Sequence, residues 1–273
     1  MSARIKASEL SWPIVCISLF AVAGLCFLLL PILVAIYLSS GNATVLEFPV
    51  NELSGRLYAE FFSKPAWRDP FLVSITIAFG TGSVSTILAV AAGYALQSVG
   101  PRGRMWMVAI FTLPMILPVI VIAVGQVFFL SRFGLLGSSS GMILSQLSVS
   151  LPPALLLVFA TIWQRGLREE ETAASLGSGR LYRLVRVTIP IYSAAIVGAF
   201  LLAFLTSFDE SVLSLFMGGA TMQTLPRKVF DGIRYDLDPV VTVAASLSFL
   251  AWLLVTSLWL VSRRTEHPVR QSS

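Results

Sequence analysis

The sequence predicts an all-α membrane protein with six transmembrane helices, and two observations carry this prediction. Residues of the AVILMFWYC class make up 56% of the 273 positions, and Asp, Glu, Lys and Arg make up only 12%. A soluble domain has about twice that charged fraction. Apolar stretches of about 20 residues, the length that crosses a bilayer, also recur between short polar breaks. Together these features exclude a disordered, collagen-like or ordinary soluble chain.

Six stretches are long and apolar enough to span, and they form one predicted domain over residues 1–273. They are residues 13–38, 71–97, 105–130, 142–163, 191–207 and 240–261. Six spans place both termini on one side of the membrane. If that side is the cytoplasm, its segments hold 12 of the 19 Lys and Arg residues. Because basic residues concentrate in cytoplasmic loops, we expect both termini to be cytoplasmic.

The first span holds both cysteines, Cys16 and Cys26, and His267 lies in the polar C-terminal tail. Two cysteines in one apolar run and a lone tail histidine provide neither a disulfide framework nor a set of metal ligands. We therefore expect no metal site, no cofactor and no His-based acid–base chemistry.

The second and third spans carry residues that affect helix packing and shape. The second is rich in Ser, Thr and Gly, which let helices approach closely and hydrogen-bond across the contact. Gly80 and Gly82 are expected to mark close packing or a bend. The third contains Pro114 and Pro118, and because proline lacks a backbone donor it kinks a helix.

The fourth and fifth spans are joined by a polar loop, residues 164–190, which we expect to form two short helices on the cytoplasmic side. The acids at 169–171 favour a first helical turn, and Gly177 is placed to end that helix. Ser178 is expected to cap a second helix that runs to about Val187.

This second helix is predicted to have an apolar stripe flanked by charge. Leu181, Leu184 and Val185 fall at i, i+3 and i+4, and three arginines repeat beside them: Arg180, Arg183 and Arg186. Such an element can lie on lipid headgroups or dock into a groove on a cytoplasmic partner.

Two carboxylates, Asp209 and Glu210, follow the fifth span. Ionisable groups within a membrane are costly and usually functional, whereas solvated acids at the interface need no special role. Both interpretations stay open. Adjacent helical residues point about 100° apart, so we expect only one carboxylate to face a pathway. The other would pair with a base such as Arg227 or Arg234.

The loop contains a motif of matching residues at fixed spacing: Glu171-x-Ala173-x-x-x-Gly177, then nine residues, then Val187-x-Ile189-Pro190. This motif resembles the EAA loop of permeases of ATP-binding-cassette importers, with Thr172, Val187 and Ile189 departing from the usual residues. The resemblance implies the MetI-like type I fold and a coupling helix seated in an ATPase subunit. The ATPase-coupling residues that it implies are Glu171, Ala173, Gly177, Ile189 and Pro190.

The resemblance extends over nearly the whole chain and narrows further at residues 207–239. Ser207-Phe208-Asp209-Glu210, Thr224-Leu225-Pro226 and Arg234-x-x-x-Asp238-Pro239 are similar to the end of spermidine and putrescine permeases. This similarity implies a polyamine substrate and favours Asp209 as the pathway residue, with Glu210 beside it. Permeases for opines, γ-aminobutyrate, phosphonates, thiamine or ferric iron share much of the pattern.

The chain is not expected to be an enzyme, since none of its three lysines lies in the Gly-x-x-x-x-Gly-Lys-Ser/Thr motif of a P-loop. The resemblance implies two copies of a separate ATPase, a second permease subunit, and an external binding protein at a bacterial inner membrane. No nucleic-acid partner is expected. The alternatives are a channel or ion-coupled carrier, which would bury charges in several spans, and a membrane enzyme, which would need a catalytic cluster.

Overall fold

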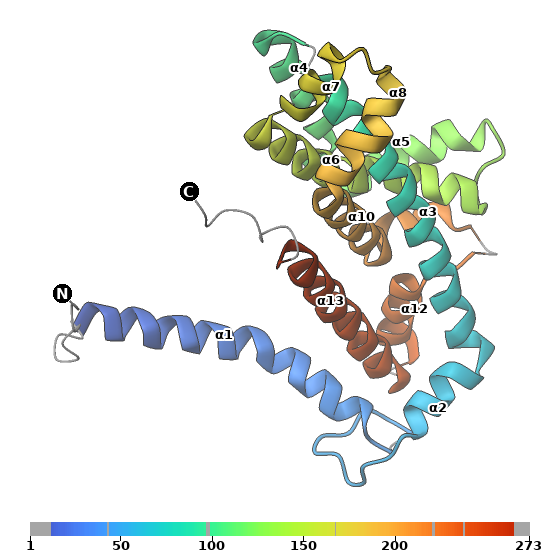
Figure 1. Ribbon diagram of the computed structural model, residues 1–273. Coiled ribbons are helices and arrows are strands. Elements are labelled where there is room, and N and C mark those ends of the chain that lie inside the picture. Colours follow the sequence, from blue (N-terminus) through green and yellow to red (C-terminus); the bar gives the residue numbers. More distant parts are fainter. Residues whose placement is uncertain are drawn as a thin grey trace. The chain divides into compact units, whose positions relative to one another are not determined.

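The computed structural model describes residues 12–42, 44–96, 99–166, 168–219, 222–236 and 238–264. Over these residues all regular secondary structure is helical, apart from one isolated antiparallel bridge between Gly41 and Leu53 (Figure 1). The prediction of an all-α protein is therefore confirmed.

The longer helices are α1 (Trp12–Ser39), α3 (Pro65–Ala95), α4 (Pro101–Thr112), α5 (Val119–Ser131), α6 (Ser139–Arg165), α10 (Ser193–Phe208) and α13 (Val240–Arg264). The short helices are α2 (Arg56–Ser63), α7 (Arg168–Ser175), α8 (Arg180–Arg183), α9 (Ile189–Ile191), α11 (Val212–Met217) and α12 (Leu225–Asp231). A 3₁₀ turn, η2 (Leu113–Met115), and two π-helical turns, η3 (Leu184–Thr188) and η4 (Gly232–Asp236), complete the set.

The chain divides into two compact units. The first comprises Met1–Phe61 and Leu237–Phe249, and the second comprises Phe62–Asp236 and Leu250–Ser273. In the first unit, the most apolar window of α1 buries none of its residues within the chain, as expected of a helix that faces lipid. The C-terminal end of α1 is tied by hydroxyl groups. Ser39 Oγ lies 2.9 Å from Tyr58 Oη of α2, and Ser246 Oγ of α13 donates to Ser39 Oγ at 3.2 Å.

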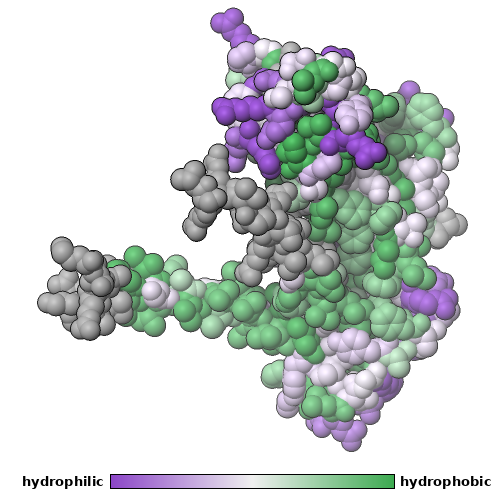
Figure 2. Space-filling model, viewed as in Figure 1, coloured by the Kyte–Doolittle hydropathy of each residue, from purple (hydrophilic) through white to green (hydrophobic). Residues whose placement is uncertain are grey.

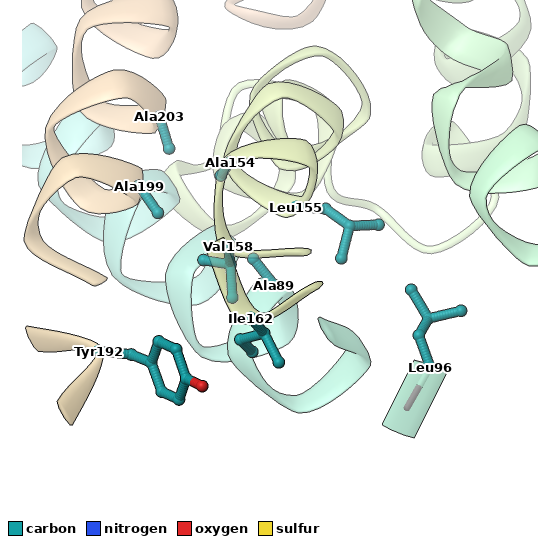
Figure 3. Close-up of a cluster of buried hydrophobic side chains, with 9 residues drawn as sticks. All are labelled: Ala89, Leu96, Ala154, Leu155, Val158, Ile162, Tyr192, Ala199 and Ala203. Atoms are coloured by element: carbon teal, nitrogen blue, oxygen red, sulfur yellow. The ribbon is translucent and has the colours of Figure 1, made fainter. Parts of the chain in front are cut away.

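In the second unit, α3, α6 and α10 pack together around a core of nine buried side chains (Figure 3). These are Ala89 of α3 and Leu96, which comes directly after it; Ala154, Leu155, Val158 and Ile162 of α6; and Ala199 and Ala203 of α10, with Tyr192 directly before it. Four of the nine are alanines. Small residues at these contacts let the three helices approach closely, as is typical of membrane helices.

Gly80 and Gly82 mark close packing, which was one of the two predicted roles. A Cβ on Gly80 would lie 2.6 Å from Ile143 Cδ1 of α6, and one on Gly82 would lie 3.2 Å from the Phe200 ring of α10. α3 continues unbroken through both positions, so the glycines permit contact and do not end or break the helix.

Three helices are long and apolar enough to span a membrane: Ile14–Ser39, Pro65–Ala95 and Ser139–Arg165. Two bent pairs raise this number to as many as five in the described residues. The third predicted span, 105–130, is one of these pairs: Pro101–Met115 and Val119–Ser131 meet at 94°. The predicted kink in this span is confirmed and is sharp, because Pro114 and Pro118 remove two backbone donors at the junction. The other pair, Arg180–Ile191 and Ser193–Phe208, bends by 78° at Tyr192, just before α10.

Candidate functional site

The loop between the fourth and fifth predicted spans folds as two helices with a tight turn between them. α7 ends at Ser175, and Gly177 follows with a φ of 83°. The Ser178 N–H donates to the Ala173 carbonyl at 3.2 Å, and the Gly177 N–H donates to the Ala174 carbonyl at 2.9 Å. These two bonds are the Schellman pattern, which requires a left-handed residue where Gly177 stands. The prediction that Gly177 ends the helix is confirmed.

The predicted capping role of Ser178 is wrong. α8 begins at Arg180 with Gly179 as its N-cap, and no side chain caps it. The Ser178 hydroxyl instead donates to the Ala173 carbonyl at 2.5 Å. The hydroxyl adds a second hydrogen bond to the carbonyl that already accepts the Ser178 N–H, because the left-handed turn brings both donors of Ser178 within its reach.

The outer face of this helical pair combines exposed apolar and charged side chains. Leu176, Leu181 and Tyr182 are 83%, 74% and 60% exposed, and Arg180 and Arg186 are exposed beside them. Of the predicted stripe, Leu181 and Val185 are exposed and Leu184 is partly buried. Figure 2 shows hydrophilic surface gathered at the end of the unit that holds α7 and α8 in Figure 1, with hydrophobic surface exposed among it.

The residues implied by the motif fall into two groups. Glu171 and Gly177 are exposed, and Ala173 is partly buried, on α7 and at its end. Ile189 and Pro190 are exposed in α9, beyond α8 and η3. Exposure leaves the side chains of Glu171, Ile189 and Pro190 accessible to another protein.

A buried carboxylate next to the motif was missed at the sequence level. Glu170 is 7% exposed, and its Oε1 accepts a hydrogen bond from the Tyr94 hydroxyl of α3 and one from Arg183 Nε of α8 at 3.3 Å. Its Oε2 accepts from Thr188 Oγ1 of η3 at 3.3 Å. A signal was present, since three adjacent acids on a helix are spread through about 200° and cannot all face water on a helix packed against the protein.

The two ends of the loop are also joined. The Tyr192 hydroxyl donates to the Gly166 carbonyl, and Arg165 Nη1 donates to the Ile191 carbonyl at 3.3 Å. The Arg165 guanidinium lies 5.9 Å from the centre of the Tyr192 ring, within cation–π range. The loop is thus closed at its base by contacts between α6 and the start of α10.

Asp209 and Glu210 have different surroundings. Glu210 Oε1 accepts the backbone N–H groups of Val212 at 2.8 Å and Leu213 at 3.0 Å, so it caps the N-terminus of α11. The expected pairing of this residue with a base is replaced by this cap. Asp209 lies directly after α10, and in the described part of the chain its carboxylate has neither a hydrogen bond nor an ion pair. Asp209 is exposed, and partial desolvation of its carboxyl by the surrounding protein raises the pKa of this group above its ordinary value.

Among the described residues, no three His, Cys, Asp or Glu side chains come together as metal ligands. The features gathered at the α7–α8 end are an exposed face of mixed apolar and charged side chains and a buried ion pair. These features suit protein binding.

The profile of one protein family, described as "Binding-protein-dependent transport system inner membrane component", matches residues 85–264. The chain belongs to this family. It is a membrane permease subunit of a binding-protein-dependent importer, and the resemblance found in the sequence is confirmed.

Individual relatives agree on the class of protein. The spermidine/putrescine transport system permease protein PotC of Haemophilus influenzae is 27% identical over 77% of this chain and 82% of the relative. The putrescine transport system permease protein PotI of Escherichia coli is 28% identical over 85% and 88%. The molybdenum transport system permease protein ModB of Mycobacterium bovis is 28% identical over 83% and 86%.

Proposed function

We propose that this chain forms half of the translocation pathway of an ATP-driven importer for polyamines such as putrescine and spermidine. In this proposal the chain crosses the inner membrane six times with both termini in the cytoplasm. It pairs with a second, different permease subunit, receives substrate from a binding protein, and is driven by two copies of a separate ATPase.

The observation that carries the coupling role is the exposed, preformed turn from α7 to α8. Gly177 in its left-handed conformation directs the chain into α8, while Leu176 and Leu181 remain exposed at 83% and 74%. Apolar side chains of this size on an ordered helical pair are typical of a surface that docks into a partner's groove. We assign Glu171, Ala173, Gly177, Ile189 and Pro190 to the contact with the ATPase.

The carboxylate of Asp209 favours a cationic substrate. A cation that leaves water regains part of its hydration energy from charge-assisted hydrogen bonds to a carboxylate. The Asp209 carboxylate has no hydrogen bond or ion pair with the described residues, whereas Glu210 is held by two backbone donors of α11. Asp209 is therefore the better pathway residue of the two, and Glu210 is the structural one.

The relatives support polyamines without deciding the substrate, because PotI and ModB are equally similar to this chain at 28% identity. An oxyanion is consequently the second candidate. It would require a cationic site in the place where this proposal puts a carboxylate.

The test is uptake into vesicles that contain this chain together with its partner permease, ATPase and binding protein. We expect ATP-dependent accumulation of radiolabelled putrescine, competed by spermidine and not by molybdate. ATP-dependent uptake of radiolabelled molybdate in place of putrescine would contradict the polyamine assignment and leave only the importer role.

The Asp209→Asn variant separates the pathway role from a structural one. We expect it to lose putrescine uptake while assembly and basal ATP hydrolysis persist. Asp69→Asn is the matched control, because it removes one exposed carboxylate whose one partner among the described residues is its neighbour Arg68 at 3.0 Å, a pair of little energetic value. Normal uptake by Asp209→Asn would rule out the pathway role.

A further inference from the structure

We propose that Glu170 is a positioning residue that latches the α7–α8 element to the C-terminal end of α3, so that movement of this element reaches the membrane helices. The proposal rests on the function proposed above. It goes beyond that function because it assigns the mechanical link to a residue outside the matched motif.

The contacts of Glu170 join four separate elements at one carboxylate. Glu170 lies on α7, and its partners Tyr94, Arg183 and Thr188 lie on α3, α8 and η3. Two of these partners belong to the loop itself. Of the three partners, Tyr94 alone belongs to a long helix. Its hydroxyl therefore makes the hydrogen bond that connects the Glu170 carboxylate to a residue outside the loop.

The hydrogen bonds and the ion pair of Glu170 are buried, which makes them costly to break. The side chains of Glu170 and Arg183 are only 9% and 16% exposed. Removing one partner of a buried ion pair leaves an uncompensated charge, and hydrogen bonds in such surroundings are stronger than at a wet surface. The carboxylate therefore holds its donors in one arrangement, in contrast to the exposed neighbours Glu169 and Glu171.

α3 is suited to transmit a displacement. It runs unbroken from Pro65 to Ala95, and Tyr94 is in its last turn. Farther along the helix, Gly80 and Gly82 allow contacts with α6 and α10 so close that a Cβ would lie within 3.2 Å of their side chains. Closely packed helices move as rigid elements, so a pull on Tyr94 displaces a helix that contacts both of its core neighbours.

The π-helical turn η3 at the end of the loop is also bonded to Glu170. η3 is a π-helical turn, and Thr188 at its end is buried and bonded to Glu170. Such turns occur often at functional sites. Here the π-helical turn brings Thr188 to the same carboxylate that α8 reaches through Arg183.

The central experiment compares Tyr94→Phe with wild type in the reconstituted, assembled transporter. This change removes one hydroxyl and leaves the bonds of Glu170 to Arg183 and Thr188 in place. We expect ATP hydrolysis to continue while substrate transported per ATP falls by about tenfold, within the usual range of coupling between sites. Glu170→Ala is expected to lower the same ratio at least as far.

Two matched variants keep the ratio interpretable. Tyr37→Phe makes the same chemical change at a tyrosine whose hydroxyl has no hydrogen bond among the described residues, and Glu169→Gln neutralises the exposed acid next to Glu170. Both are expected to transport with the wild-type ratio. A loss of transport and ATP hydrolysis together in Tyr94→Phe would indicate a purely structural role and overturn the latch, as would an unchanged ratio.

A second measurement needs neither ATPase nor substrate. Hydrogen–deuterium exchange of the α7 amides, in the chain embedded in nanodiscs, should be faster in Tyr94→Phe than in wild type or Tyr37→Phe. Unchanged exchange would refute the latch itself. If instead exchange responds but the wild-type complex shows no ATP-dependent uptake, the proposed function fails and the latch stands.

Discussion

At the scale of single residues, the backbone at Gly177 is the most demanding feature of the loop. Its φ of 83° lies in the left-handed region, and a Cβ there would meet no atom within 4 Å. There is thus room for a side chain at this position, and only the backbone conformation disfavours one. The left-handed conformation costs about 1–2 kcal/mol for a residue with a Cβ.

Because the backbone conformation at Gly177 is strained for other residues but the space around it is open, two substitutions are expected to differ. Gly177→Leu should abolish transport while the protein remains in the membrane, because the strained turn no longer delivers α8 to the ATPase. Gly177→Asn should retain most transport, since asparagine tolerates the left-handed conformation. The measurement is uptake and ATPase binding by each variant. Wild-type uptake by Gly177→Leu with the ATPase still bound would contradict the coupling role.

At the scale of elements, the start of α6 is fixed by a compact cap. Ser138 Oγ accepts the Gly141 N–H at 3.1 Å and donates to the Leu135 carbonyl at 2.7 Å. The turn brings the Leu135 carbonyl so near that a Cβ on Gly141 would lie 2.0 Å from its oxygen. A backbone atom cannot rotate away as a side chain does, so only glycine fits.

Gly141→Ala should therefore destabilise the protein by about 1–3 kcal/mol, the usual cost of overpacking. The matched change is Gly125→Ala in α5, where a Cβ would meet nothing within 4 Å. That variant should be neutral or gain up to about 1 kcal/mol from better helix propensity. Thermal unfolding of both purified variants measures the difference. Equal stability of Gly141→Ala and wild type would contradict the tight cap.

Sequence patterns predicted some of these elements better than others. The acids at 169–171 and Gly177 are local signals, and the helix that they predict begins and ends accordingly. The prediction that Ser178 caps α8 failed because the left-handed turn placed its hydroxyl beside the Ala173 carbonyl, to which it donates. Two prolines predicted the break in the third predicted span. The 94° angle between its halves depends on how the two helices pack, which the sequence pattern does not determine.

The candidate site shows the same limit. The motif residues of the loop could be identified because the motif is contiguous, and their contact with the ATPase stays a prediction. Glu170 could not be assigned, because its partners Tyr94 and Arg183 lie 76 and 13 residues away and meet it only in the folded chain. Likewise, the resemblance favoured Asp209 over its neighbour, but the capping bonds from Val212 and Leu213 that hold Glu210 could not be predicted from the sequence.

At the scale of the whole molecule, the proposed orientation rests on the distribution of charge along the chain. In the proposed topology the cytoplasmic segments hold 12 of the 19 basic residues, and the loop that contains Arg180 holds five of them. The same topology places the loop around Glu52 outside. Arg180 and Glu52 are both exposed, so each is accessible to a reagent on its own side. Ser272, which the topology places in the cytoplasm, lies outside the described residues.

Cysteine labelling tests this orientation directly. Cys16 and Cys26 are exposed on α1 and would first be replaced by alanine, so that Arg180→Cys or Glu52→Cys provides the only thiol. In intact cells, an impermeant maleimide should label the Glu52→Cys variant and not the Arg180→Cys variant. Inverted vesicles should give the opposite result, because the proposed topology places the α7–α8 loop in the cytoplasm. Labelling of position 52 only in inverted vesicles would reverse the topology and, with it, the coupling role proposed for α7 and α8.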